Sequence, residues 1–242
     1  MFKCEYKWIF FVIILKIFLG NGVMADWRNA NRDSVGIAPD PSVDKEAIIQ
    51  VYSARAFGWR GFFGTHTWFA VKPSNASKFT VYEVIGWRLM RGEHTLAISN
   101  RIPDGRWFGK DPEVIAELRG QTTDNIIKKL DKIAKAYPHK NSYRVWPGPN
   151  SNTFIAYVAR SIPELALDLP PTAIGKDFLS NGKFVASTPS GTGYQLSLLG
   201  LIGILLGKEE GLEINILGLT FGIDPLDLAI KVPFAGRVSI KK

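Results

Sequence analysis

The sequence is poor in cysteine: Cys4 is the only one in 242 residues. It lies ahead of an apolar stretch near the N-terminus, whereas lipid attachment needs a cysteine just after such a stretch. A leader peptidase that cuts behind the stretch would remove it. We therefore expect the folded domain to have no disulfide, no thiolate nucleophile and no cysteine metal ligand.

Motifs that identify common enzyme classes are also missing. The sequence has no G-x-x-x-x-G-K-[ST] phosphate loop, no G-x-S-x-G nucleophile turn and no H-E-x-x-H zinc motif. Its three histidines, His66, His94 and His139, do not have the spacing of metal ligands. The sequence therefore predicts neither a metal site nor a cofactor.

The N-terminal segment Met1–Ala25 has the layout of an export signal. Lys3 and Lys7 precede the apolar run Trp8–Leu19, and Val23–Ala25 offers residues that a signal peptidase accepts. The run is shorter than the ~20 residues of a spanning helix, and Lys16 interrupts it. We expect a signal peptide, with an uncleaved membrane anchor as the alternative. Both place the protein outside the cytoplasm, in the periplasm or anchored to the inner membrane.

The charge is basic. The leader holds three lysines and one glutamate, so +6 of the net charge of +8 lies in the rest of the chain. A basic exported protein favours anionic neighbours such as phospholipid headgroups or acidic wall polymers, although solubility alone also explains the charge. Export argues against nucleic acid. We expect an envelope peptide or lipid as partner, and a membrane surface is possible.

Behind the leader, the pattern predicts a polar linker over residues 26–46 and a single α+β domain over residues 47–242. β-branched and aromatic residues bounded by turns predict strands at Ile48–Ala54, Thr65–Val71, Phe79–Ile85 and His94–Ser99. Pro112 can begin a short helix that reaches Leu118. Apolar stripes predict helices at Thr123–Tyr137 and Phe154–Ile162.

The C-terminal part differs in character. Leu196–Leu206 is strongly apolar but contains two glycines and is too short to span a bilayer. It predicts either a buried strand pair or a segment lying against the membrane, and we favour the buried pair. Glu213–Phe221 and Ala229–Ile240 predict further strands.

One arrangement of residues could perform chemistry. His66 lies on a predicted strand, and Ser151 lies at the start of a predicted helix, where free backbone N–H groups and the helix dipole favour an oxyanion. A serine hydroxyl needs a base to become a nucleophile, and His66 is the leading candidate. Glu83, on the following strand, could orient the imidazole.

This order resembles the circularly permuted papain-like fold, which includes NlpC-type cell-wall peptidases and lecithin:retinol acyltransferase-like enzymes. The resemblance rests on His66, Ser151 and Phe154, in the pattern N-[C/S]-x-x-F at a helix start, and it spans roughly residues 48–162. In those families a cysteine at the helix N-terminus attacks an amide or ester, and a histidine activates it. The resemblance implies a papain-like core over about residues 47–163, followed by a β-rich C-terminal extension over residues 164–242.

The whole chain also resembles an uncharacterised bacterial family of exported proteins. That likeness is carried by H-T-W at His66–Trp68, W-P-G-P-N-S-N-T-F at Trp146–Phe154 and L-P-P-T-A-I-G-K-D at Leu169–Asp177. It implies no activity.

Each candidate residue also has a purely structural interpretation. Asn150, Ser151 and Asn152 are all preferred helix N-caps, and a cap requires no catalysis. Serine replaces the cysteine of the papain-like pattern, a change that usually abolishes activity in a site built for a thiolate. His66 could be a hydrogen-bonded core residue, and Glu83 could face solvent. If the site binds substrate, Asn150, Asn152, Trp68 and Trp146 are the candidates for contacting it.

The sequence thus leaves three functional hypotheses. The first is a cell-envelope amide or ester hydrolase or acyltransferase in which Ser151 attacks, His66 is the base and Glu83 orients it. The second is a non-catalytic envelope binding or scaffold protein that keeps a degenerate papain-like cleft. The third is an envelope-lipid factor, suggested by Leu196–Leu206 and by the basic charge.

Overall fold

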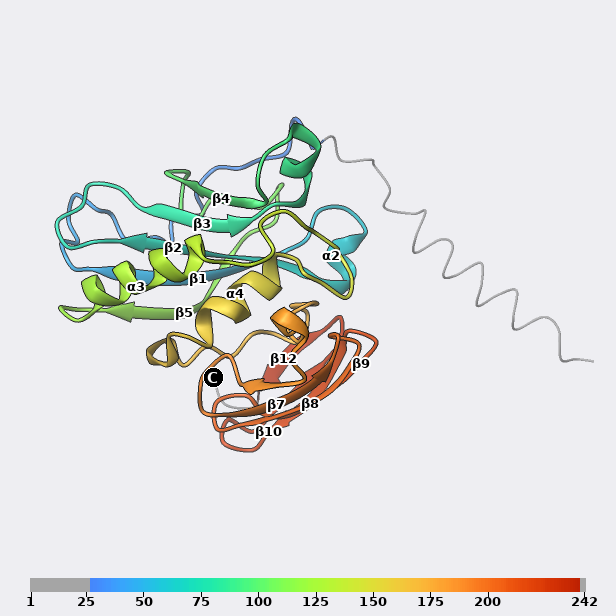
Figure 1. Ribbon diagram of the computed structural model, residues 1–242. Coiled ribbons are helices and arrows are strands. Elements are labelled where there is room, and N and C mark those ends of the chain that lie inside the picture. Colours follow the sequence, from blue (N-terminus) through green and yellow to red (C-terminus); the bar gives the residue numbers. More distant parts are fainter. Residues whose placement is uncertain (1–26, 240–242) are drawn as a thin grey trace, which may run out of the picture.

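The computed structural model describes residues 27–239 and contains two antiparallel sheets with a helix between them (Figure 1). The predicted leader, residues 1–25, lies outside the described residues. None of the helices within residues 27–239 is long and apolar enough to cross a membrane. The α+β class and the β-rich C-terminal part, both expected from the sequence, are confirmed.

The first sheet has five strands in the order β4-β3-β2-β1-β5. Their bounds are β1 Ile48–Arg55, β2 Thr65–Lys72, β3 Thr80–Val84, β4 Leu96–Ser99 and β5 Glu113–Arg119. β1 to β4 confirm the four predicted strands. The helix expected from Pro112 to Leu118 is wrong, because β5 pairs along the edge of β1 and sheet pairing overrides a weak helix propensity.

Three helices accompany this sheet: α2 Arg60–Phe63, α3 Thr123–Lys135 and α4 Ser151–Ala159. α3 and α4 pack on one face of the sheet, where Phe69 of β2 meets Phe154 of α4 in the larger core. The opposite face carries a second, smaller core that includes Trp68 and Tyr52, whose rings stack at 5.5 Å. Successive residues of β2 therefore point to different cores, as the two-residue period of a strand requires.

The second sheet is a meander of seven strands in sequence order. The strands are β6 Val185–Ser187, β7 Gly193–Leu198, β8 Ile202–Gly207, β9 Gly211–Ile216, β10 Leu219–Asp224, β11 Ala229–Val232 and β12 Gly236–Ser239. Figure 1 shows it in orange and red below the first sheet, with α4 between the two. Each of the two longer strands predicted after residue 212 is in fact a hairpin, because positive-φ residues at Leu217 and Phe234 turn the chain.

Residues 27–46, expected to be a linker, are held against the domain by the Asp104 carboxylate. It accepts hydrogen bonds from Ser34 Oγ at 2.8 Å and from the backbone N–H groups of Ile37 and Ala38 at 2.8 and 3.1 Å. These bonds, with burial opposing them, lower the pKa of Asp104. The segment therefore belongs to the folded unit.

Candidate functional site

Asn150 is the N-cap of α4. Its side-chain oxygen accepts from the backbone N–H groups of Asn152 and Thr153 at 3.0 and 3.1 Å, and Thr153 Oγ1 accepts from the Asn150 N–H at 3.1 Å. This reciprocal pair is a capping box. The Asn150 amide also donates to the carbonyls of Val145 and Ile174, both at 2.9 Å. With all its polar atoms engaged inside the protein, Asn150 has a structural role and is not free to contact substrate.

Ser151 is the first residue of α4, and its side chain is almost fully buried. The titratable group that it influences is the phenol of Tyr143, which also lies within electrostatic reach of Arg60. Burial raises the pKa of Tyr143, and Arg60 and the Ser151 hydroxyl oppose that rise without cancelling it. The Ser151 hydroxyl therefore has a neutral phenol as its neighbour.

Thr67 and Asn152 connect the first sheet to the start of α4. Thr67 Oγ1 donates to Asn152 Oδ1 at 2.8 Å, and Asn152 Nδ2 donates to the carbonyls of Thr65 and Ile174 at 3.1 and 2.8 Å. The side-chain oxygen and nitrogen of Asn152, like those of Asn150, are hydrogen-bonded within the protein. The residue of β2 that faces the helix N-terminus is thus Thr67.

His66 points to the other side of the sheet. Its ring stacks on Trp107 with centroids 3.6 Å apart, and its Nε2 lies 3.0 Å from Glu83 Oε2. Arg101 Nε donates to the second oxygen of Glu83 at 2.8 Å. His66, Glu83 and Arg101 form one compact group on the face that carries the smaller core.

The protonation of this group follows from its surroundings. Burial lowers the pKa of His66, and the hydrogen bond to Glu83 only partly offsets this. Burial disfavours the charged form of Glu83, but the hydrogen bond from His66 and the charge of Arg101 outweigh it and lower the pKa of Glu83 to about 2. The group therefore holds a neutral imidazole that donates to an ionised carboxylate paired with arginine.

The structure therefore brings His66 and Glu83 together, as the sequence suggested, but it does not bring either to Ser151. Thr67, next to His66 in β2, hydrogen-bonds to α4, so the two side chains lie on opposite faces of the same strand. A shift of one residue along a strand moves a side chain to the other face. The relay from Glu83 through His66 to Ser151 is not assembled.

The two tryptophans proposed as substrate contacts differ from each other. Trp68 is 0% exposed, and its indole N–H donates to the carbonyl of Pro103 at 2.8 Å, so it is a core residue. Trp146 is 51% exposed, and its N–H donates to the carbonyl of Leu217 at 2.8 Å. Leu217 lies in the β9–β10 turn. Trp146 therefore lies at one end of the second sheet, next to residues that are distant from it in the sequence.

A family model described as a protein of unknown function, DUF3750, matches residues 46–178. The chain belongs to this family. No curated protein and no solved structure matches the chain. The matched residues of this DUF3750 protein include the first sheet, α3, α4 and the segment to Phe178 that follows them, and the second sheet lies beyond the match.

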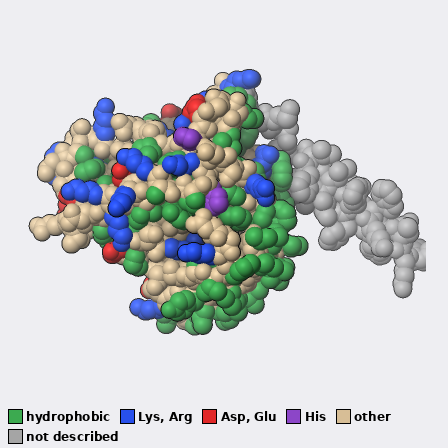
Figure 2. All heavy atoms as spheres, viewed as in Figure 1, with side chains coloured by type: hydrophobic (Ala, Val, Ile, Leu, Met, Phe, Trp, Pro, Cys, Tyr) green, Lys and Arg blue, Asp and Glu red, His purple; other side chains and the backbone are tan. Residues whose placement is uncertain are grey.

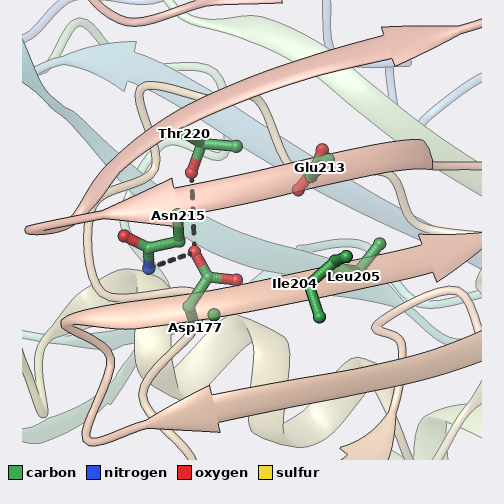
Figure 3. A pocket seen from close by; sticks show the side chains of 7 residues that line it. Asp177, Ile204, Leu205, Glu213, Asn215 and Thr220 are labelled. Carbon is green, nitrogen blue, oxygen red and sulfur yellow. Dashed lines mark hydrogen bonds between the residues drawn. The ribbon is translucent and has the colours of Figure 1, made fainter.

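The second sheet of this DUF3750 protein turns a polar face inward. Asn215 and Thr220 point at the carboxylate of Asp177 (Figure 3), and Asn215 Nδ2 donates to it at 2.9 Å. Gln195, on the neighbouring part of the same face, donates to the other oxygen of Asp177. Asp177 therefore attaches the sheet to the DUF3750 domain.

A buried charge network extends this attachment. Lys231 Nζ, fully buried, lies 2.6 Å from Asp168 Oδ1 and 2.7 Å from Glu213 Oε1. Lys176 pairs with Glu213 and, at 3.2 Å, with Asp177. Lys176 and Asp177 therefore form an ion pair beneath the second sheet.

The outer face of the same sheet is apolar. On β7 to β10 every outward position is hydrophobic: Tyr194, Leu196, Leu198, Ile202, Ile204, Leu206, Leu212, Ile214, Ile216, Leu219, Phe221 and Ile223. Figure 2 shows hydrophobic side chains gathered at the lower right, over the C-terminal strands of Figure 1. We call these twelve residues the outer face. The buried strand pair favoured from the sequence is present as β7 and β8, but of its leucines and isoleucines only Leu205 points inward and is buried.

Proposed function

We propose that this protein is a non-catalytic interaction protein of the cell envelope, and that the outer face is its binding surface. One observation carries the proposal: a sheet whose polar side faces the protein and whose apolar side faces solvent. An antiparallel sheet with one solvated face normally shows the reverse arrangement. A contiguous exposed apolar surface of this kind marks an interaction site, because leaving it in water is unfavourable.

The inward polar residues support this interpretation. Glu213 of β9 and Lys231 of β11 are buried and pair with each other, and Glu213 also pairs with Lys176 beneath the sheet. A register slip of one residue would expose this polar set and bury the apolar one, and the paired charges oppose such a slip. The sheet is therefore held with its apolar side outward by specific contacts.

The DUF3750 domain supports the non-catalytic half of the proposal. In the papain-like interpretation, the imidazole belongs on the side of the sheet that faces the helix N-terminus, and Thr67 occupies that position here. Ser151 replaces the cysteine, and its neighbour is the phenol of Tyr143. We propose that the domain is a degenerate papain-like core that supports the outer face. The predicted export places that face in the envelope.

A cysteine-labelling experiment in cells tests the proposal. In a full-length Cys4→Ser background, Ile204→Cys places a thiol on the outer face and Ile98→Cys places one on β4 of the first sheet, where Ile98 is also exposed. Spheroplasts are treated with a membrane-impermeant maleimide. We expect the thiol at position 98 to react, because the domain is exported, and the thiol at position 204 to react at least tenfold more slowly, because its face is covered.

A variant of the surrounding residues provides the control. Leu196→Gln and Ile214→Gln flank position 204 on the paired strands, and together they should restore its labelling. Equal labelling of positions 98 and 204 in the unmodified background would show an uncovered face and overturn the proposal. Labelling of neither position before lysis would overturn the export.

The hydrolase or acyltransferase hypothesis is the second candidate, and the position of Ser151 in the first turn of α4 favours it. In that case Tyr143, and not His66, would have to accept the serine proton. Burial raises the pKa of Tyr143, so its ionised form is scarce near neutral pH. The geometry thus favours the non-catalytic function.

A further inference from the structure

We propose that the outer face docks onto the surface of an anionic phospholipid bilayer. This inference rests on the proposed function, in which the outer face is a binding surface, and names its partner. The partner follows from four features: the chemistry of the face, its shape, the residues at its rim and the charge of the chain after the leader.

The chemistry of the outer face is that of a hydrocarbon surface. Ten of its twelve residues are leucine or isoleucine, and none carries a charge or an amide. They form rows across the strands, for example Ile216–Ile202–Leu198 and Ile214–Ile204–Leu196. Protein interfaces usually include arginine, methionine and directed hydrogen bonds. Apart from the Tyr194 hydroxyl, the outer face offers none of these, and acyl chains require none.

The shape of the apolar surface favours a deformable partner. At one end of the sheet, the β7–β8, β9–β10 and β11–β12 turns bear Leu199, Leu217 and Phe234. Phe62 of α2 stacks on Phe234 at 5.9 Å and extends the surface beyond the sheet. A second copy of the sheet could cover the flat face by packing against it, but it would leave this end in water. Lipid chains can cover both.

Tryptophan and arginine stand side by side at that end. Arg144 and Trp146 flank Val145, and all three are exposed. On α2, the Arg60 guanidinium lies 5.1 Å from the centre of the Trp59 ring. Tryptophan is enriched at the boundary between hydrocarbon and headgroups, and arginine extends its charge to the headgroup phosphates.

The net charge of the protein and the position of its predicted leader both favour a bilayer as the partner. The chain after the leader carries a net charge of +6, which attracts an anionic membrane surface by about 1 kcal/mol for each lysine or arginine near it. The predicted leader ends its apolar run at Leu19, eight residues before Trp27. An extended chain of that length spans at most about 29 Å. The leader therefore delivers the domain at a membrane, whether it is later cut or kept.

Environment-sensitive labels test the docking directly. The full-length Cys4→Ser protein is labelled with the fluorophore NBD at Ile204→Cys, and in a matched sample at Lys129→Cys on α3, an exposed residue of the DUF3750 domain. Both are reconstituted with vesicles of phosphatidylcholine that contain phosphatidylglycerol as the minor, anionic lipid. The leader tethers the domain equally in the two samples, so only docking of the outer face distinguishes the labels.

We expect NBD at position 204 to shift its emission to the blue and to be quenched by brominated lipid chains, and NBD at position 129 to do neither. Replacing phosphatidylglycerol by phosphatidylcholine should weaken the quenching at least threefold. A water-exposed label at position 204 in these vesicles would overturn the lipid inference.

A further measurement separates failure of this inference from failure of the proposed function. If position 204 is shielded without vesicles and sedimentation shows a dimer, a second copy covers the face. Lipid is then the wrong partner, but the interaction surface is real. If position 204 is water-exposed in vesicles and is also labelled freely in spheroplasts, both proposals fail.

Discussion

The Thr67 hydroxyl donates a hydrogen bond to Asn152 Oδ1 over 2.8 Å. This contact fixes which side of β2 faces the N-terminus of α4. Because neighbouring residues of a strand point to opposite faces, it also places His66 away from Ser151. The hydroxyl and the imidazole that the sequence suggested as a pair therefore lie apart, and the imidazole has Glu83 as its partner.

The first prediction concerns Ser151. Ser151→Ala should lower the free energy of unfolding by at most about 1 kcal/mol, because Asn150, and not Ser151, caps the helix. Asn150→Ala should cost about 3 kcal/mol, because it removes the helix cap and leaves buried carbonyls without donors. Urea unfolding followed by circular dichroism measures both values.

A serine-reactive phosphonate completes this test. We expect no covalent labelling of the folded wild type, because Ser151 is buried and His66 points to the opposite face of the first sheet. Labelling that disappears in Ser151→Ala would show an activated serine and would favour the hydrolase hypothesis over the binding function.

The sequence predicts the first four strands and both long helices because those segments combine the right period with turn residues at their ends. It cannot predict the side to which His66 points, because a strand with both faces buried does not alternate between apolar and polar residues. β2 reads T-H-T-W-F-A-V-K, and every residue from His66 onward is buried. The register is set by contacts with α4, which lies much later in the chain, beyond the whole of the first sheet.

The prediction that the apolar residues of the second sheet are buried is wrong for a related reason. The segment Y-Q-L-S-L of β7 alternates clearly, and alternation predicts a strand with two different faces. The usual assumption then places the apolar face inside. The burial of Asp177, Lys176 and Lys231 reverses it, and their pairing depends on partners that are distant in sequence. The signal that could have revealed this is the repeated placement of charged residues on the opposite face, Glu213 on β9 and Asp224 on β10.

The second prediction is a pH dependence from His66. Burial lowers its pKa, so the folded protein holds a neutral ring, whereas the unfolded chain takes up a proton near the ordinary pKa of 6.5. Stability therefore falls as the pH drops through 6.5. His66→Gln lacks this titration and keeps a donor for Glu83, so its deficit of about 1 kcal/mol at pH 7.5 should shrink toward pH 5.5.

Thermal unfolding of the wild type and His66→Gln across this pH range gives the difference. His139 remains in both proteins, so its own titration cancels. A deficit that grows as the pH falls would mean that the folded protein holds a protonated ring paired with Glu83, contrary to the neutral imidazole described above.

The third prediction compares two neighbours on β8. Ile204 is 45% exposed on the outer face, whereas Leu205 points inward and is 2% exposed. Leu205→Ala should lower the free energy of unfolding by about 3 kcal/mol, because it leaves a cavity. Ile204→Ala should cost less than about 1 kcal/mol in the absence of lipid, because its side chain is half in water. Equal losses in urea unfolding would mean that the protein itself covers the outer face.

The fourth prediction concerns the ions beneath the sheet. Lys231→Met should lower the free energy of unfolding by about 3 kcal/mol, because it removes the buried cation that pairs with the partly buried Asp168 and the buried Glu213. Lys208→Met, in the β8–β9 turn with an exposed partner at 3.8 Å, is the matched control and should change stability by less than about 0.5 kcal/mol.

The same variant has a characteristic pH dependence. Burial raises the pKa of Asp168 to about 6, and Lys231 opposes that rise, so Lys231→Met should raise the pKa further. Where the folded pKa exceeds the unfolded one, the bound proton stabilises the protein at low pH, and this stabilisation is lost as the pH rises through the folded pKa. In the wild type, the stabilisation by the Asp168 proton is lost by about pH 6. In the variant, whose Asp168 pKa is higher, stability continues to fall above pH 6. The deficit of Lys231→Met should therefore be smaller at pH 5 than at pH 8, and a deficit that is constant between these values in thermal unfolding would show that Asp168 is not its cause.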